Sequence, residues 1–282
     1  MELSLQIFNY LNQPGSLWHT GLAQQLADRK LLDMSIIHPD DYTLSSCIAN
    51  ADGIRETNYL LPDTGNIHIV APSKELNSFY QKHGLVVPPL DQGGSEQVAT
   101  KVQRALAVFD KVDAVATFIR QIVKSVQILE ASDSETDVSY SHPDIPFSIF
   151  FSVCQQDSPV GDLRVAESIL HEAMHLQLTL IEGCCPLIEQ NTKHTYYSPW
   201  RDEERPVRGV LHGMFVFRAI LDFYLMISQL AVEKDIQAFL QNRISTIITE
   251  IKQLSDFGNS PGLTTDGKIL TNKLKLSVNG EI

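Results

Sequence analysis

The segment DLRVAESILHEAMHLQLTLIE, residues 162–182, decides the fold, because its apolar residues predict one long helix that is buried on most sides. Asp162 at its start and Gly183 after its end are typical helix boundaries. A polar stripe crosses this helix at spacings of three and four residues, and its members are Ser168, His171, His175, Thr179 and Glu182. Because buried polar groups are costly without partners, the stripe predicts a functional site.

The motif HEAMH, residues 171–175, supplies the chemistry of that stripe. His171 and His175 are four residues apart, so their rings project from the same helix face and can bind one divalent metal. Glu172 points about a quarter-turn away, where it can stand beside a metal-bound water or orient a neighbouring group. The motif therefore predicts a metal site, and with it a metalloenzyme.

A third metal ligand has to come from outside the motif. The extended form HExxHxxGxxH is absent, since Leu178 and Ile181 occupy the positions of its glycine and third histidine. Acidic residues before the next predicted helix are alternatives, namely Glu182, Glu189, Asp202, Glu203 and Glu204. His212 is the better candidate, because it lies among apolar residues in the middle of a helix predicted to begin at Arg205-Pro206 and to continue to Leu230.

Arginines near His212 suggest an anionic co-ligand. Arg208 precedes His212 by four residues and shares its helix face, and a guanidinium binds a carboxylate through two parallel hydrogen bonds. A metal-bound keto acid anchored by Arg208 is therefore chemically sensible. Arg201 and Arg205 compete for this role, and a surface ion pair is an equally ordinary use of Arg208.

The remaining segments predict an α+β fold that is predominantly α-helical, with a helical catalytic core and a small β-sheet. Turn residues at 88–95 indicate a connection between an N-terminal lobe, residues 1–94, and a metal-binding catalytic region, residues 95–282. We expect the two to form one compact unit, in which the lobe is the natural candidate for substrate capture. Up to residue 60 we expect short helices and turns, broken at 38–41 and 51–53, and then a strand at 67–71. One or two helices are expected from Glu96 to Ala131, including Val126 and Leu129, followed by a buried strand at 147–153. A helix is expected at 233–255, and the tail after Pro261 is expected to be polar and weakly ordered.

Composition limits the classes of function. The chain has 282 residues, 43% of them hydrophobic, which is enough for a substantial core. Its net charge of −12 and the lack of a basic block argue against nucleic-acid partners. We read no apolar run of about 18 residues and no signal peptide, so we expect a soluble, cytoplasmic protein without a membrane partner. The four cysteines are too few and too irregularly spaced for a disulfide framework.

Two separated stretches, HEAMHLQL and YYSPWRDEERPVRGVLHGMFVF, resemble the HExxH-motif proteins that accompany ribosomally made, post-translationally modified peptides. The resemblance rests on the run Tyr197 to Asp202, then on Arg205-Pro206, and then on residues 209–213. Weaker similarity in SHPDIPFSIFFS and LTTDGKILTNKL extends it over roughly the C-terminal half of the chain.

This resemblance implies an iron(II)- and 2-oxoglutarate-dependent dioxygenase that hydroxylates the β-carbon of a side chain in a ribosomally made precursor peptide. It implies iron bound by His171, His175 and His212, and one arginine, Arg208 or Arg201, holding the far carboxylate of 2-oxoglutarate. Glu172 then supports the metal site. The alternatives are a zinc-dependent peptidase, in which Glu172 is the general base, and a metal-stabilised peptide-binding protein without turnover.

Overall fold

The computed structural model describes residues 3–37, 59–60, 67–72, 74–89, 92–131, 133, 136–231 and 233–276. The chain divides into two compact units: a sheet unit, residues 27–176, and a helical unit, residues 1–26 and 177–282. The α+β, predominantly helical fold expected from the sequence is confirmed. The unit boundaries differ from the predicted division at residues 94 and 95, and a role of residues 1–94 in substrate capture stays a prediction.

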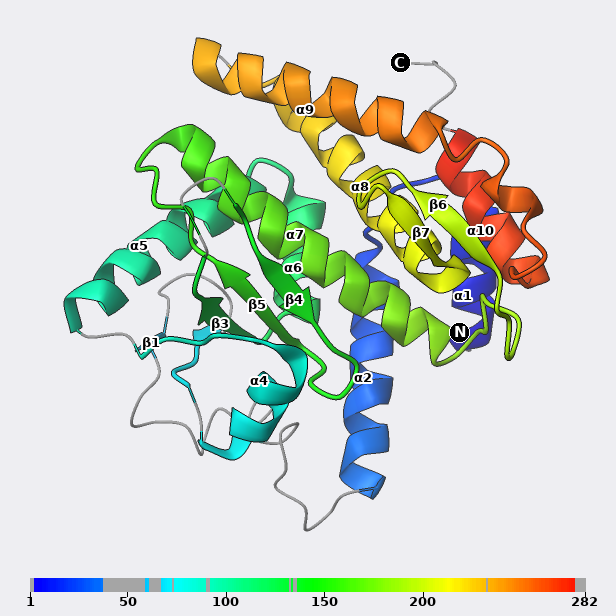
Figure 1. The fold of residues 1–282 in the computed structure, drawn as a ribbon, viewed down its shortest axis with the longest axis horizontal. Coiled ribbons are helices and arrows are strands. Elements are labelled where there is room, and N and C mark those ends of the chain that lie inside the picture. Colours follow the sequence, from blue (N-terminus) through cyan, green and yellow to red (C-terminus); the bar gives the residue numbers. More distant parts are fainter. Residues whose placement is uncertain are drawn as a thin grey trace. The chain divides into compact units, whose positions relative to one another are not determined.

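The sheet unit contains a mixed five-stranded sheet in the order β1-β2-β3-β5-β4 (Figure 1). Its strands are β1 (Tyr59–Leu60), β2 (His68–Ile69), β3 (Ser125–Leu129), β4 (Ser139–Ser141) and β5 (Ser148–Ser152). The central pairs β2–β3 and β3–β5 are parallel, whereas β1 and β4 pair with β2 and β5 in antiparallel fashion. The predicted strands at 67–71 and 147–153 are thus confirmed as β2 and β5.

The strand β3 corrects one sequence prediction. Val126 and Leu129 fit a helical spacing, yet they lie in a strand whose five residues are all buried. A strand buried on both faces reads as a continuous apolar run, which periodicity alone cannot distinguish from a buried helix. Pairing with β2 and β5 on either side decides the structure, and a hydrogen bond of 2.9 Å between the Ser125 and Ser148 hydroxyls joins β3 to β5.

Short helix α4 (Asn77–His83), preceded by the 3₁₀ turn η2 (Lys74–Leu76), covers one face of this sheet. Phe79 and Tyr80 of α4 pack with Leu129 and Phe150 in a hydrophobic cluster. The Tyr80 hydroxyl also donates a hydrogen bond of 2.5 Å to the side-chain oxygen of Gln127 on β3. These contacts hold α4 against β3 and β5.

Three longer helices lie wholly or mostly in the sheet unit: α5 (Gln92–Phe109), α6 (Asp113–Ile122) and α7 (Pro159–Glu182). Residues 27–37 of helix α2 (Thr20–Ile37) also belong to it. α7 is the helix predicted from the sequence, with three residues more at its start, and it continues into the helical unit. Helix α5 begins at Gln92, so the predicted connection at 88–95 ends earlier than expected. Its glycines lie in the first turn of the helix, where glycine is tolerated because the first backbone N–H groups have no partner within the helix.

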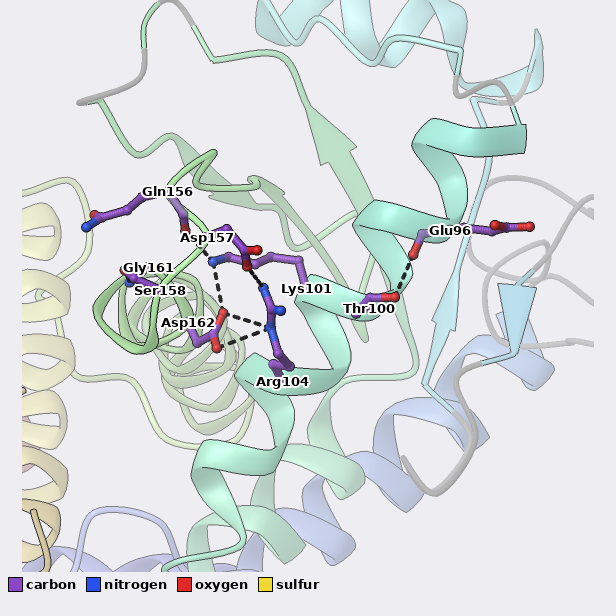
Figure 2. Close-up of polar contacts among 9 residues, drawn as sticks. All are labelled: Glu96, Thr100, Lys101, Arg104, Gln156, Asp157, Ser158, Gly161 and Asp162. Atoms are coloured by element: carbon purple, nitrogen blue, oxygen red, sulfur yellow. Dashed lines mark hydrogen bonds and ion pairs between the residues drawn. The ribbon is translucent and has the colours of Figure 1, made fainter. Parts of the chain in front are cut away.

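A buried ion pair fastens the start of α7 to α5 (Figure 2). Lys101 is only 6% exposed; its Nζ lies 2.9 Å from Asp162 and donates a hydrogen bond of 2.6 Å to the Gln156 carbonyl. Arg104 binds the same Asp162 and also Asp157. Because a buried charge needs a partner, this cluster ties the first turn of α7 to its neighbour.

In the helical unit, α8 (Val207–Ser228) forms the core and contacts α9 (Lys234–Lys252), α10 (Thr265–Leu276) and the hairpin of β6 (Thr195–Ser198) and β7 (Glu203–Pro206) (Figure 1). Helix α1 (Leu3–Asn12), the start of α2 (Thr20–Ile37) and the 3₁₀ turn η3 (Phe257–Asn259) complete it. Gln177 at the end of α7 donates hydrogen bonds to the Tyr10 hydroxyl and the Leu17 carbonyl.

Several boundaries in this unit differ from the sequence prediction. α9 confirms the helix expected at 233–255, and α8 confirms the helix before it, but Arg205 and Pro206 belong to β7 because they pair with β6. The tail expected to be weakly ordered contains α10, whose Leu270 and Leu274 are fully buried against the core. The predicted breaks at 38–41 and 51–53 lie outside the described residues.

Within the described part of the chain, α8 is the one helix that is long and apolar enough to cross a membrane. This finding differs from the expectation that no apolar run reaches about 18 residues. Most of its apolar stretch, 72%, is buried inside the protein, and a core helix passes the same test of length and composition. The feature is therefore weak evidence for a membrane span.

Candidate metal centre

The two histidines of the motif converge on α7 as their spacing predicts. Both rings are partly buried, and their Nε2 atoms lie 3.1 Å apart. Two nitrogens that bind one metal at about 2.1 Å are separated by about 3.0 Å at a right angle and about 3.4 Å at a tetrahedral angle. The pair His171 and His175 therefore fits the donor set that a divalent metal requires.

Glu172 is held by the sheet. Its side chain is 4% exposed, and each carboxylate oxygen accepts a hydrogen bond of 2.6 Å from a serine of β4: Oε1 from Ser139 and Oε2 from Ser141. Oε1 also lies 3.9 Å from Nε2 of His171. The carboxylate thus stands beside the histidine pair in a fixed orientation.

Sequence reasoning did not identify the two serines. The alternation Ser139-Tyr140-Ser141 is a signal for a strand with one polar face, but it is only three residues long and follows an acidic, turn-rich segment. Their partner is 31 to 33 residues away in the sequence. Only the packing of β4 beside α7 brings the hydroxyls to Glu172.

His212 lies in the second turn of α8, nearer the start of this helix than expected, and is 6% exposed. Its Nε2 is 3.1 Å from Oε2 of Glu182, the last residue of α7. Arg208, one turn earlier on α8, donates hydrogen bonds of 2.9 Å and 2.7 Å from Nε and Nη2 to the same oxygen. The helical unit therefore brings together an imidazole, a carboxylate and a guanidinium.

The charges of this cluster influence one another. Burial raises the pKa of the Glu182 carboxyl, but hydrogen bonds and charge interactions with His212 and Arg208 outweigh it, so the pKa lies below its usual value. Burial lowers the pKa of His212 and exceeds the opposing influence of Glu182. The cluster thus favours a neutral imidazole, which is the form that binds metals.

The other two arginines lie in or beside the β6–β7 hairpin. Arg201 is exposed in the turn. Arg205 on β7 lies near Glu203, with 3.7 Å between Nε and Oε1, and its side chain passes close to Gly209. Of the three arginines predicted to hold a co-ligand, Arg208 is the one that shares a carboxylate partner with His212.

The hairpin also packs on the turn of α8 that carries His212. Trp200 stacks on Phe217 with 4.9 Å between ring centroids, and its ring covers Gly213 so closely that a Cβ there would lie 2.7 Å from a ring carbon. The sequence run SPWRD and the sequence GVLHG thus meet in space. Their joint presence in the sequence has a structural reason.

The third ligand of the predicted metal site, His212, lies in a different unit from the histidine pair. Among the described residues, no group of three or more His, Cys, Asp and Glu side chains is found that could hold a metal. His171 and His175 belong to the sheet unit, whereas His212 belongs to the helical unit. The third ligand therefore stays a prediction from the sequence.

No protein-family model matches the chain, and no curated protein matches it as a relative.

Proposed function

We propose that the protein is an iron(II)- and 2-oxoglutarate-dependent dioxygenase that hydroxylates the β-carbon of a side chain in a ribosomally made precursor peptide. The observation that carries the proposal is the convergence of the His171 and His175 Nε2 atoms to 3.1 Å on one face of α7. In the proposed site these two residues bind the iron, and His212 is the third ligand on the grounds of its sequence context.

Arg208 is the proposed anchor for the far carboxylate of 2-oxoglutarate. Its guanidinium already binds a carboxylate, that of Glu182, while its side chain remains 50% exposed. A guanidinium recognises a carboxylate through a planar, charge-assisted arrangement, which orients the bound acid as well as attracting it. Arg201 and Arg205 are weaker candidates because neither is held beside His212 by a shared partner.

Iron with 2-oxoglutarate and oxygen would supply the oxidation that replaces a C–H bond by a C–OH bond, with release of succinate and carbon dioxide. The role of the chain's own residues is to bind the iron and to bind and orient 2-oxoglutarate. Glu172 supports this reading over a zinc peptidase, in which it would take a proton from a metal-bound water. Both of its oxygens already accept serine hydrogen bonds, and its side chain is buried.

The test combines metal binding with product analysis. Protein purified without oxygen is given iron(II), 2-oxoglutarate, air and the precursor peptide encoded beside its gene. We expect succinate and a peptide heavier by one oxygen atom with the wild type and with His194→Ala, whose side chain is exposed, but neither product with His175→Ala. Peptide cleavage that depends on zinc, or metal binding without turnover, would contradict the proposal.

A further inference from the structure

The environment of Glu172 carries a further inference, which rests on the proposed metal binding by His171 and His175. Glu172 is a buried carboxylate in the sheet unit, and its neighbours come from two elements, α7 and β4. A buried carboxylate is costly unless hydrogen bonds replace its hydration. The groups that donate these hydrogen bonds therefore determine the orientation of the carboxylate.

The two serines suit this task because they share one face of a strand. Residues two apart in a strand point to the same side, so Ser139 and Ser141 face α7 together while Tyr140 faces the other way. Their hydroxyls donate to different oxygens of Glu172, both at 2.6 Å. That length is typical of hydrogen bonds from a hydroxyl to a charged carboxylate, and two such bonds fix the plane of the group.

The face of strand β4 that points away from α7 carries Tyr140, which contacts helix α4 and strand β5. It pairs with β5, and in the order of the described strands it stands at the sheet edge, where one side lacks a neighbouring strand. The Tyr140 hydroxyl lies 2.8 Å from Nδ1 of His83 on α4, and its ring packs against the hydrophobic cluster around Phe79 and Phe150. The serine hydroxyls are therefore placed before any metal binds.

The carboxylate held in this way stands next to a proposed metal ligand. Oε1, which accepts the hydrogen bond from Ser139, is 3.9 Å from Nε2 of His171. A negative charge at that position attracts a cation bound by the histidines, and burial limits its screening by salt. Mutation of groups that do not bind the metal but orient or contact its ligands commonly lowers metal affinity by about 10- to 100-fold.

We infer that Ser139 and Ser141 are positioning residues of the metal site: through paired hydrogen bonds they hold Glu172 beside His171 and so increase the affinity of the histidine pair for a divalent cation. They act through Glu172 and do not bind the metal. The same hydrogen bonds keep Glu172 from serving as a base toward a metal-bound water.

The experiment titrates cobalt(II), an air-stable substitute for iron(II), into metal-free full-length protein and follows heat and visible absorption. We expect Ser139→Ala with Ser141→Ala to weaken cobalt binding by about 10- to 100-fold and to change its absorption spectrum. Each single variant should lose less, and Ser139→Thr, which keeps the hydroxyl, should retain most of the affinity. The single variants decide the question if the double variant does not fold.

Two controls separate positioning from general stability. Ser148→Ala removes a buried serine hydrogen bond in the same sheet without touching Glu172, and it should leave cobalt affinity unchanged. In a Glu172→Gln background the serine substitutions should add little further loss, because residues that act through one group are coupled. Additive losses in that background would overturn the inference.

The outcomes also distinguish this inference from the proposed function. If the wild type binds cobalt and the serine variants keep its affinity and spectrum, the positioning role is wrong while the proposed function stands. If the wild type binds neither cobalt nor iron, the proposed function itself is refuted.

Discussion

Replacing Gly213 by alanine tests the packing of the hairpin on α8. In the middle of a helix this substitution ordinarily stabilises a protein by about 1 kcal/mol. Here the new Cβ would lie 2.7 Å and 2.8 Å from two ring carbons of Trp200, where an ordinary carbon contact needs about 3.5 Å or more. The ring would have to move by nearly 1 Å, away from its stacked position on Phe217.

The expected net effect follows from these opposing contributions. Overpacking costs about 1–3 kcal/mol, loss of the aromatic pair costs about 0.5–1.5 kcal/mol, and helix propensity returns about 1 kcal/mol. We therefore expect Gly213→Ala to lower the free energy of unfolding by about 0.5–3.5 kcal/mol. Urea unfolding followed by far-ultraviolet circular dichroism measures it, provided that the m-value is unchanged.

Gly209→Ala is the matched control on the same helix. The nearest atom to its new Cβ is Nε of Arg205 at 3.6 Å, an ordinary contact, so this variant should be neutral or stabilised by up to about 1 kcal/mol. If Gly213→Ala is as stable as Gly209→Ala, the close packing of Trp200 on this turn of α8 is refuted.

Three further predictions concern charge and metal. Asp162→Asn leaves Lys101 buried without its ion-pair partner and should lower the free energy of unfolding by about 3–5 kcal/mol, measured in urea. In the control Asp157→Asn, the replaced side chain is 81% exposed, so the loss should be at most about 1 kcal/mol. Equal losses in the two variants would contradict a stabilising role of the buried ion pair. Burial lowers the pKa of Lys273 from 10.5 to about 8, so as pH rises the folded state loses this proton before the unfolded state does. The free energy of unfolding should therefore rise as pH increases above 8. Lys273→Met should abolish this rise, which is measured by urea unfolding at a series of pH values between 7.5 and 9.5. Cobalt(II) at a hundred times its dissociation constant should raise the free energy of unfolding of the wild type by about 2.7 kcal/mol and leave that of His175→Ala unchanged. Thermal unfolding with and without cobalt measures the effect. An equal rise of the unfolding temperature in both proteins would exclude His175 as a ligand.

Much of the candidate site follows from local pattern. The spacing of apolar residues predicts α7, and four residues of helical rise are enough to place His171 and His175 on one face. The same reasoning places Arg208 and His212 one turn apart on α8. These predictions hold because each depends on neighbours within a single helix.

The partners of these residues could not be predicted in the same way. Glu182 was recognised as part of the polar stripe, but its hydrogen bonds with Arg208 and His212 join positions 26 and 30 residues apart. Arg201 and Arg205 compete with Arg208 for the same role, and sequence spacing does not rank them firmly. The shared carboxylate of Glu182, which binds Arg208 and His212, distinguishes Arg208 from the other two.

From the sequence alone, then, come the long helix α7 with its histidine pair, the buried strand β5 and the predominantly helical fold, because helix and strand periodicity are local properties. The tertiary structure alone decided that Val126 and Leu129 lie in a strand, that the chain after Pro261 forms α10, and that Glu172 is held by Ser139 and Ser141. The physical reason is shared: each depends on which distant segment supplies the missing hydrogen bonds or buries the apolar face, and that choice is made only when the whole chain packs.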